Sequence, residues 1–286
     1  MQAADLAVDG TTADGTLIPS ASPGQPPTLQ PVAHHNPARL GLRVLTVNTH
    51  KGFTALNRRF MLPALRDAVR QVGADLVFLQ EVLGAHDGHA QRHPGWPVVP
   101  QYEFLANDLW PQFAYGRNAV SPVSHHVNAL LSRYPIQRFH NRDISLHGDE
   151  RRGLLHCEIA LPGGRPALHA VCVHLGLRES HRQRQLDMLC ELIEREVPAG
   201  SPLVVAGDFN DWRHRAHVVL EQGAGLCEVF QHAHGKSART FPARWPLLHL
   251  DRIYVRNVDV HAPLSLPRQP WTHLSDHAPL AAEVQL

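Results

Sequence analysis

The sequence has almost no lysine and no surplus of positive charge. Only Lys51 and Lys236 occur among 286 residues, and 27 Lys and Arg residues stand against 26 Asp and Glu, which gives a formal net charge of +1. A protein that holds nucleic acid with a large basic surface usually carries more positive charge than this. The balance argues against such a surface, although it leaves room for a nuclease with a small basic cleft.

Long hydrophobic runs and paired cysteines are also missing. No run approaches the roughly 18 apolar residues of a membrane span, and the N-terminus lacks the basic start and apolar stretch of a secretory signal. The cysteines show no CxxC pairing and lie in apolar settings, which is typical of reduced core thiols in a cytosolic protein and argues against a structural zinc site. They are Cys157, Cys172, Cys190 and Cys227. We therefore expect a cytoplasmic protein without a transmembrane segment.

The beginning of the chain differs in composition from the rest. Residues 1–40 contain six prolines, only four charged residues and no period of 2 or 3.6 residues. This composition predicts a disordered, low-complexity leader. From Leu42 onward no second linker of comparable composition appears, and the chain's 43% hydrophobic residues suffice for a sizeable core. We assign residues 41–286 to a single domain.

Short apolar runs predict eight strands along this domain. They cover Leu42–Asn48, Leu76–Gln80, Ala129–Ser132, Leu154–Leu161, Leu168–His174, Leu203–Ala206, Arg252–Val255 and Pro279–Val284. Apolar residues at helical spacing predict two helices, over Leu62–Val72 and Leu186–Val197, and Pro198 stops the second. Strands outnumber helices, and the helices fall between groups of strands. This order favours a layered α/β sandwich with mixed sheets over an α/β barrel.

Carboxylates, amides and imidazoles stand at the ends of the predicted strands. The start of a strand lies beside the end of its antiparallel neighbour, so these side chains can all gather at one edge of the sandwich. Each position alone is explained by a turn-capping side chain, but six coincidences favour a catalytic cluster. The residues are Asn48, Glu81, His174, Asp208, Asn210, Asp251, Asp276 and His277.

Such a cluster supports a narrow range of chemistry. Glu81, Asn48 and one of the aspartates offer hard oxygen ligands that suit Mg²⁺ or Mn²⁺. A histidine beside an acid that orients it is typical of general-base catalysis. Together these groups favour phosphoryl transfer, in which a metal neutralises charge and an imidazole activates water. The sequence has no GxxxxGK[ST] loop and no GxSxG elbow, which disfavours a P-loop hydrolase and an esterase.

Five short motifs occur in the order found in the endonuclease/exonuclease/phosphatase (DNase I-like) superfamily, and residues 42–286 resemble it as a whole. The motifs are Val44–Asn48, Leu79–Val82, Gly207–Asn210, Leu250–Val255 and Ser275–Leu280. The resemblance implies an α/β fold, the four-layered α/β sandwich with two packed mixed β-sheets. It also implies a divalent-metal-dependent phosphoester hydrolase, most simply a phosphodiesterase that uses Mg²⁺ or Mn²⁺. DNase I-like cleavage of DNA or RNA is one alternative, and a catalytically silent phosphate-binding scaffold is another.

The resemblance also assigns roles to individual residues. Glu81, Asn48 and Asp276 resemble the metal ligands. His277 resembles the histidine that activates water or stabilises the phosphate, with Asp251 as its orienting partner. Asp208 and Asn210 resemble the pair that positions the nucleophile and the scissile phosphate. His174 matches a second, catalytic histidine of the DNase I and sphingomyelinase branches.

Arginines near these motifs are candidates for contact with substrate phosphate. Arg117 and Asn118 occupy a segment similar to one in the family, and Arg178 closely follows the His174 strand. Arg182 and Arg184, by contrast, are expected to lie on the solvated first turn of the second helix. Nucleic-acid cleavage would need such basic residues near the cleft.

The substrate stays open between lipid-linked, headgroup and nucleic-acid phosphodiesters. The segments around Asn48–Phe53 and His174–Glu179 resemble an uncharacterised bacterial branch often associated with a cardiolipin synthase neighbour, which favours a lipid or headgroup phosphodiester. Exposed Trp-Pro loops would give peripheral membrane contact, and Gly95–Pro100 and Ala243–Leu248 are the two candidates, although burial against the sandwich is the alternative for each. We expect a monomer.

Overall fold

The computed structural model describes residues 39–84, 93, 95–116, 126–146 and 150–286. Nearly all of the predicted leader, and both Arg117 and Asn118, lie outside these residues. The described residues belong to one compact unit of the chain.

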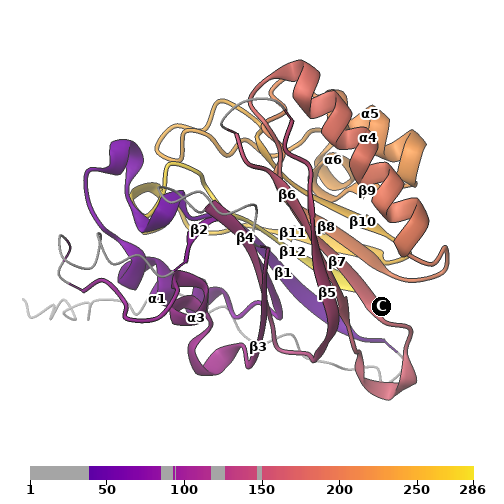
Figure 1. Cartoon of the computed structure of the whole chain (residues 1–286), viewed down its shortest axis with the longest axis horizontal. Helices are drawn as coiled ribbons and strands as arrows, with labels where there is room; N and C mark the ends of the chain where they lie inside the picture. Colours follow the sequence, from indigo (N-terminus) through magenta and orange to yellow (C-terminus); the bar gives the residue numbers. More distant parts are fainter. Residues whose placement is uncertain (1–38, 85–92, 94, 117–125, 147–149) are drawn as a thin grey trace, which may run out of the picture. The chain divides into compact units, whose positions relative to one another are not determined.

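Twelve strands in the described residues form two six-stranded sheets (Figure 1). The first sheet has the order β11 (Asp259–Leu264), β12 (Leu280–Gln285), β1 (Gly41–Asn48), β2 (Leu76–Leu83), β4 (His126–Ser132), β3 (Gln112–Gly116). The second has the order β5 (Ile136–Asp143), β6 (Gly153–Ile159), β7 (Leu168–His174), β8 (Leu203–Asp208), β10 (Asp251–Arg256), β9 (Cys227–Glu228). Strands β1 and β2 are parallel, as are β7 and β8, while the other pairs are antiparallel, so both sheets are mixed.

The helices divide between the two sheets. They are α1 (Leu62–Val72), α3 (Gln101–Ala106), α4 (Glu179–Glu196), α5 (Arg215–Ala224) and α6 (Val229–His234). Single 3₁₀ turns occur at His50–Gly52, Ala55–Asn57, Asn107–Leu109, Pro162–Gly164 and Trp271–His273. Helices α1 and α3 pack on the sheet that contains β1 and β2, and α4 and α5 pack on the sheet that contains β7 and β8 (Figure 1). The result is the four-layered α/β sandwich.

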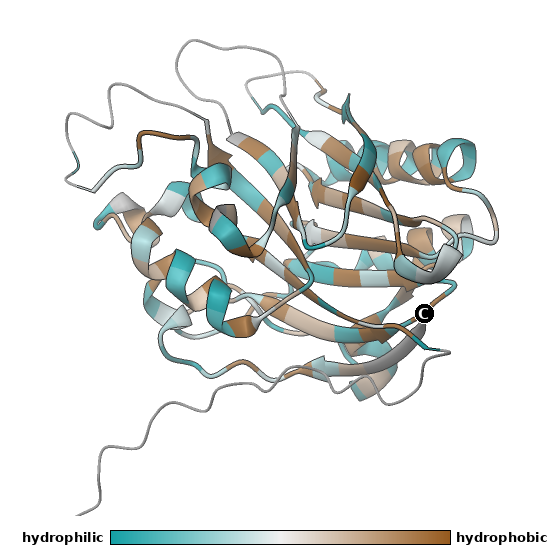
Figure 2. Cartoon of the chain, turned by 90° about the horizontal axis from the view of Figure 1, so that it is seen from below, coloured by the Kyte–Doolittle hydropathy of each residue, from teal (hydrophilic) through white to brown (hydrophobic). Residues whose placement is uncertain are grey.

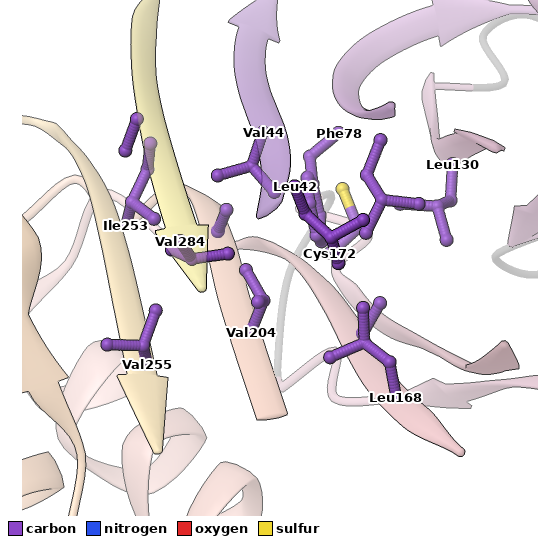
Figure 3. Close-up of a cluster of buried hydrophobic side chains, with 14 of the residues drawn as sticks. Leu42, Val44, Phe78, Leu130, Leu168, Cys172, Val204, Ile253, Val255 and Val284 are labelled. Carbon is purple, nitrogen blue, oxygen red and sulfur yellow. The ribbon is translucent and has the colours of Figure 1, made fainter. Parts of the chain in front are cut away.

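Each central strand is buried on both faces, because one face meets the other sheet and the opposite face meets helices. In β7, Ala170 and Cys172 join the core between the sheets, whereas Val171 and Val173 pack under α4. Figure 3 shows the inter-sheet core, where Val44 and Phe78 of one sheet lie near Cys172 of the other. Figure 2 shows the same division as brown strands flanked by helices of mixed hydropathy. Burying each large apolar side chain contributes roughly 1.5–3 kcal/mol.

All eight predicted strands and both predicted helices are present; β7 and α1 have the predicted bounds, and the other elements have shifted ends. Among the strands, β2 continues past Gln80 to Leu83 and β4 begins at His126 instead of Ala129. The largest shift is in α4, which begins at Glu179, about two turns before the predicted start at Leu186, because its first residues are polar. The sequence did not predict β3, β5, β9 and β11. Strand β5 was missed because its sequence IQRFHNRD is mostly exposed and polar, as edge strands often are.

The four cysteines are free thiols, but only two are core residues. Cys157 and Cys172 are buried between the sheets, whereas Cys190 and Cys227 are partly exposed. The prediction of core thiols is therefore wrong for the second pair, which lie at the borders of apolar clusters. In the described part of the chain, no helix combines the length and apolar character needed to cross a membrane.

Gly207 allows β8 to approach β7 closely just before the end of β8 at Asp208. A Cβ at this position would lie 1.9 Å from the carbonyl oxygen of Val173, and the φ of +149° is rarely adopted by residues with side chains. We therefore expect Gly207→Ala to lower the free energy of unfolding by at least about 3 kcal/mol. A Cβ at Gly200 meets nothing within 4 Å, so Gly200→Ala should change stability by no more than about 0.5 kcal/mol. Urea unfolding of both variants checks this, and equal midpoints would contradict it.

Candidate active site

The register of three neighbouring strands brings polar side chains together at one edge of the second sheet. His174 is the Cα partner of Asp208 in the parallel pair of β7 and β8, and Asp251 is the partner of Asp208 in the antiparallel pair of β8 and β10. All three residues are buried. Because the end of β8 lies beside the start of β10, the sequence-based argument about strand ends is correct at this edge.

Asn48 connects this edge to the end of the first sheet. Its Nδ2 donates to Asp208 Oδ2 at 3.1 Å and to Glu81 Oε1 at 3.4 Å. Glu81 lies in an irregularity of β2, where the register with β4 shifts between Leu79 and Val82, and its φ is +55°. Bulges often turn a side chain toward a functional site, and such backbone strain persists where the surroundings enforce it. The irregularity thus brings Glu81 into the cluster.

His277 and Asp251 form the shortest polar contact of the cluster. His277 Nδ1 lies 2.8 Å from Asp251 Oδ2, both side chains are buried, and the ring of Phe241 packs 5.0 Å from the imidazole. Burial alone would lower the pKa of His277, but the charges of Asp251 and Asp208 outweigh it and raise that pKa to about 10. His277 is therefore an imidazolium at neutral pH, and its Nε2 is left facing Asp208 at 3.9 Å.

Asp208 lies at the centre of the cluster. Its Oδ2 is 3.1 Å from Asn48 Nδ2, 3.6 Å from His174 Nε2 and 3.9 Å from His277 Nε2. Burial raises the pKa of the Asp208 carboxyl to about 7, although the charge of His277 opposes the shift. A carboxyl with a pKa near neutrality can exchange a proton with water or substrate at working pH.

His50 belongs to the cluster but was not predicted. Its Nδ1 lies 3.1 Å from Asp276 Oδ2 and 3.9 Å from Glu81 Oε2. Its Nε2 is buried and has no hydrogen-bond partner among the described residues. His50 follows Asn48 in a turn with a φ of +44°, outside any strand, so no strand-end pattern pointed to it. The only available signal was its place two residues after Asn48.

The donors at this edge fit a hard divalent cation on the Glu81 and Asp276 side. Both carboxylates are about one-fifth exposed, and His50 lies between them. Another tight group is Asp208, Asp251 and His277, whose ligand atoms all lie within 4.8 Å of one another. Asn48 turns its nitrogen toward Glu81, and its Oδ1 accepts the N–H of His50, so it would have to rotate its amide to act as a ligand.

The predicted phosphate-binding residues differ in their placement. Asn210 is buried and has a φ of +50°. Its backbone N–H donates to Asp208 Oδ1, and its Nδ2 donates to the carbonyl of Leu175 at 2.9 Å. Arg178 is exposed at the N-cap of α4, four residues past the end of β7. Both therefore stay close to the cluster along the chain.

The prediction that Arg182 is solvated is wrong. Its side chain is buried, donates to the carbonyls of Gly176 and Leu177, and pairs with Glu179. The guanidinium also stacks over the ring of Trp212 at 4.3 Å. Arg182 was misplaced because the helix turns it inward over the loop that follows His174, whereas Arg184 is exposed as expected.

The chain belongs to the Endonuclease/Exonuclease/phosphatase family, whose profile matches residues 45–277. Members of this family are mostly hydrolases of phosphoesters, including phosphodiesterases and nucleases, and are typically dependent on a divalent metal. The chain is similar to Uncharacterized protein YbhP of Escherichia coli (strain K12), with 58% identity over 248 residues that cover 87% of this chain and 98% of that protein.

Solved structures share the fold. An endonuclease/exonuclease/phosphatase from Beutenbergia cavernae DSM 12333 matches with a TM-score of 0.70 and 21% identity, over 86% of this chain and 72% of that one. Humanized D. rerio TDP2 with 14 mutations matches with a TM-score of 0.64 and 18% identity, over 85% of this chain and 98% of that one. These similarities confirm the four-layered architecture that the sequence motifs implied.

The pair of His277 and Asp251 generates a prediction about pH. In Asp251→Asn, the pKa of His277 should fall well below about 10, because the nearest negative charge is gone. The pKa of His277 is about 6.5 in the unfolded chain and about 10 in the folded protein. The protonated ring therefore stabilises the fold fully below pH 6.5, and this stabilisation is lost as the pH rises through about 10. The stability advantage of the wild type should therefore shrink between pH 7 and pH 10. NMR titration of His277 and urea unfolding at both pH values test this, and an unchanged pKa would disprove the pairing.

Proposed function

We propose that this protein is a divalent-metal-dependent phosphodiesterase whose substrates are lipid-linked or headgroup phosphodiesters. The observation that carries the proposal is the convergence of Asn48, Glu81, His174, Asp208, Asp251 and His277 at one edge of the two sheets, each within 4 Å of another member. A cation held by Glu81 and Asp276 would supply charge neutralisation for the scissile phosphate.

The chain's own residues supply the remaining roles. Asp208 Oδ2 and His277 Nε2, which are 3.9 Å apart, together hold the attacking water; the Asp208 carboxylate accepts its proton, because the imidazole of His277 is already protonated and can only donate a hydrogen bond. Asp251 orients the ring of His277 through Nδ1. His174 and Asn210 hold phosphate oxygens, and Arg178, exposed at the start of α4, adds a further contact.

An exposed apolar rim beside the cluster favours the lipid-linked substrate. We define the rim as Leu177, Trp212, Trp245 and Leu247, whose exposed fractions are 56%, 40%, 52% and 64%. Leu177 and Trp212 follow His174 and Asn210 closely in the chain. The Trp245 loop is closed by the bridge between Phe241 and Leu248, and Ala243 N–H donates to the carbonyl of Asp276 at 2.7 Å. Exposed apolar side chains on loops that adjoin a phosphate site suit an acyl chain or bilayer surface better than a polyanion.

The other Trp-Pro loop, Gly95–Pro100, has one side chain packed on the protein and two exposed. Trp96 stacks on Phe60 with ring centroids 4.9 Å apart, while Val98 and Val99 are exposed. The expectation of burial thus fits Trp96, and the expectation of an exposed loop fits the two valines.

A nuclease is the second candidate function. One solved relative in fold is D. rerio TDP2 complexed with single strand DNA product, which matches with 17% identity and a TM-score of 0.61. Several arginines lie near the cluster along the chain, but Arg182 and Arg152 are engaged in protein contacts and Arg215 pairs with Glu179 at 3.3 Å. Among the described residues this removes three arginines from the multiple phosphate contacts that duplex DNA needs, while Arg151, Arg178 and Arg213 are exposed.

The metal role of Glu81 is tested by Glu81→Gln. Turnover of an activated phosphodiester should fall at least about 100-fold at limiting Mg²⁺, because the variant loses a charged ligand. The fold should be retained, since the side chain is not part of the apolar core. Glu103→Gln on α3 is the matched control and should leave turnover unchanged. Wild-type activity and metal dependence in Glu81→Gln would remove Glu81 from the site.

The substrate is tested by comparing phospholipid vesicles, plasmid DNA and single-stranded nucleic acid at equal phosphate concentration. We expect turnover of phospholipid or headgroup diester to exceed nicking of plasmid. Trp245→Ser with Leu247→Ser should lower turnover on vesicles at least about tenfold and leave a water-soluble diester unaffected. Val218→Ser, equally exposed but on α5, is the control. Plasmid nicking that is lost in His277→Ala, with no lipid or headgroup turnover, would contradict the proposal.

A further inference from the structure

A second cluster of histidine and carboxylate side chains lies on the outer face of the second sheet. His140 is on the edge strand β5, His156 is on β6, and Glu196 is the last residue of α4. His140 and His156 are direct cross-strand partners. His156 is the Cα partner of Val171 on β7, three residues before His174, so this cluster is about 10 Å along the strand from the candidate active site.

The ligand atoms of this cluster already face one another. His140 Nε2 is 2.8 Å and His156 Nδ1 is 3.3 Å from Glu196 Oε2, and the three ligand atoms all lie within 4.8 Å of one another. Two ligands about 2.0–2.1 Å from a tetrahedral Zn²⁺ are roughly 3.3 Å apart. The His156–Glu196 separation of 3.3 Å already matches this value, and the His140–Glu196 separation of 2.8 Å is about half an ångström shorter, so Glu196 and His140 would move slightly apart when an ion binds.

A third histidine, His169, forms a hydrogen bond with the ring nitrogen of His156 that points away from Glu196. His156 Nε2 lies 2.9 Å from His169 Nδ1, and both rings are buried. A neutral imidazole carries a proton on one ring nitrogen and a lone pair on the other. If Nδ1 binds a metal, the proton of His156 sits on Nε2, where His169 Nδ1 accepts it. Hydrogen bonds of this kind orient ligating imidazoles in metal proteins.

The groups around the cluster favour a metal ion that prefers imidazole ligands over one that needs several carboxylates. Glu196 ends α4, where the helix carbonyls already present partial negative charge, so a cation is favourable there. Nearby Glu158 is engaged by Arg138 in a two-point pair at 2.7 and 3.1 Å, and Arg195 adds a positive charge at the rim. Two imidazoles and one carboxylate suit Zn²⁺ better than Mg²⁺.

We propose that His140, His156 and Glu196 form a zinc site, separate from the candidate active site, that fastens the C-terminal end of α4 to the β5–β6 edge. The side chains of His140 and Glu196 are 47% and 35% exposed and line a surface hollow of about 490 Å³, so the ion enters from solvent and water completes its coordination. Zinc here stabilises the fold without taking part in hydrolysis.

The test is a zinc titration of the full chain in excess Mg²⁺, monitored by competition with a chromophoric chelator. The wild type should bind one equivalent that resists Mg²⁺. His140→Ala and Glu196→Gln should each bind zinc at least about tenfold more weakly. Replacing zinc with Co²⁺ should give the visible absorption of a four-coordinate ion in the wild type and lose it in both variants. Zinc should also raise the melting temperature of the wild type but not of Glu196→Gln.

Two control variants separate this site from the rest of the protein. His234→Ala removes an exposed histidine at the end of α6 and should bind zinc like the wild type. Glu81→Gln should also retain the equivalent, because Glu81 belongs to the other cluster. Circular dichroism of each variant checks its folding. Failure of the wild type to bind zinc, or retention by both folded variants at wild-type affinity, would overturn the proposal, as would loss of the equivalent in Glu81→Gln.

Discussion

The hydrogen bond from Asn48 to Asp208 joins the two sheets at their polar edge, and the arrangement of the cluster depends on it. Each residue ends a strand that is buried on both faces, so neither backbone can shift without disturbing the inter-sheet core. Asn48 and His174 each contact both Glu81 and Asp208. The site is therefore positioned by the packing of the two sheets against each other rather than by a flexible loop.

Much of this arrangement could be predicted from the sequence, because buried strands leave a strong pattern. The runs that became β1, β7 and β8 are continuous and apolar, and the polar residue after each run marks its end. Strand β5 could not be found, since an edge strand with one solvated face carries arginine and histidine. His50 and Arg182 could not be placed either, because a turn and a tertiary contact put them where they are.

The two metal-related clusters differ in how visible they are in the sequence. The residues around Glu81 belong to motifs that stand in order along the chain. His140, His156 and Glu196 come from two strands and the end of a helix, and no fixed spacing relates them. Composition offered only a high histidine count, 22 in all, which does not say where imidazoles meet. Their proximity follows from cross-strand pairing and from the length of α4.

The cysteines differ in burial, so the rates at which they are alkylated can report how often the two sheets separate. Cys157 and Cys172 face the space between the sheets, and burial raises the pKa of Cys172 to about 12, so almost no thiolate is present near neutrality. Alkylation of either residue requires the two sheets to separate. Cys190 and Cys227, which are partly exposed, react through smaller local motions. In a single alkylation experiment, slow reaction of the two buried thiols thus measures global opening, and fast reaction of the two partly exposed thiols measures local fluctuation at the surface.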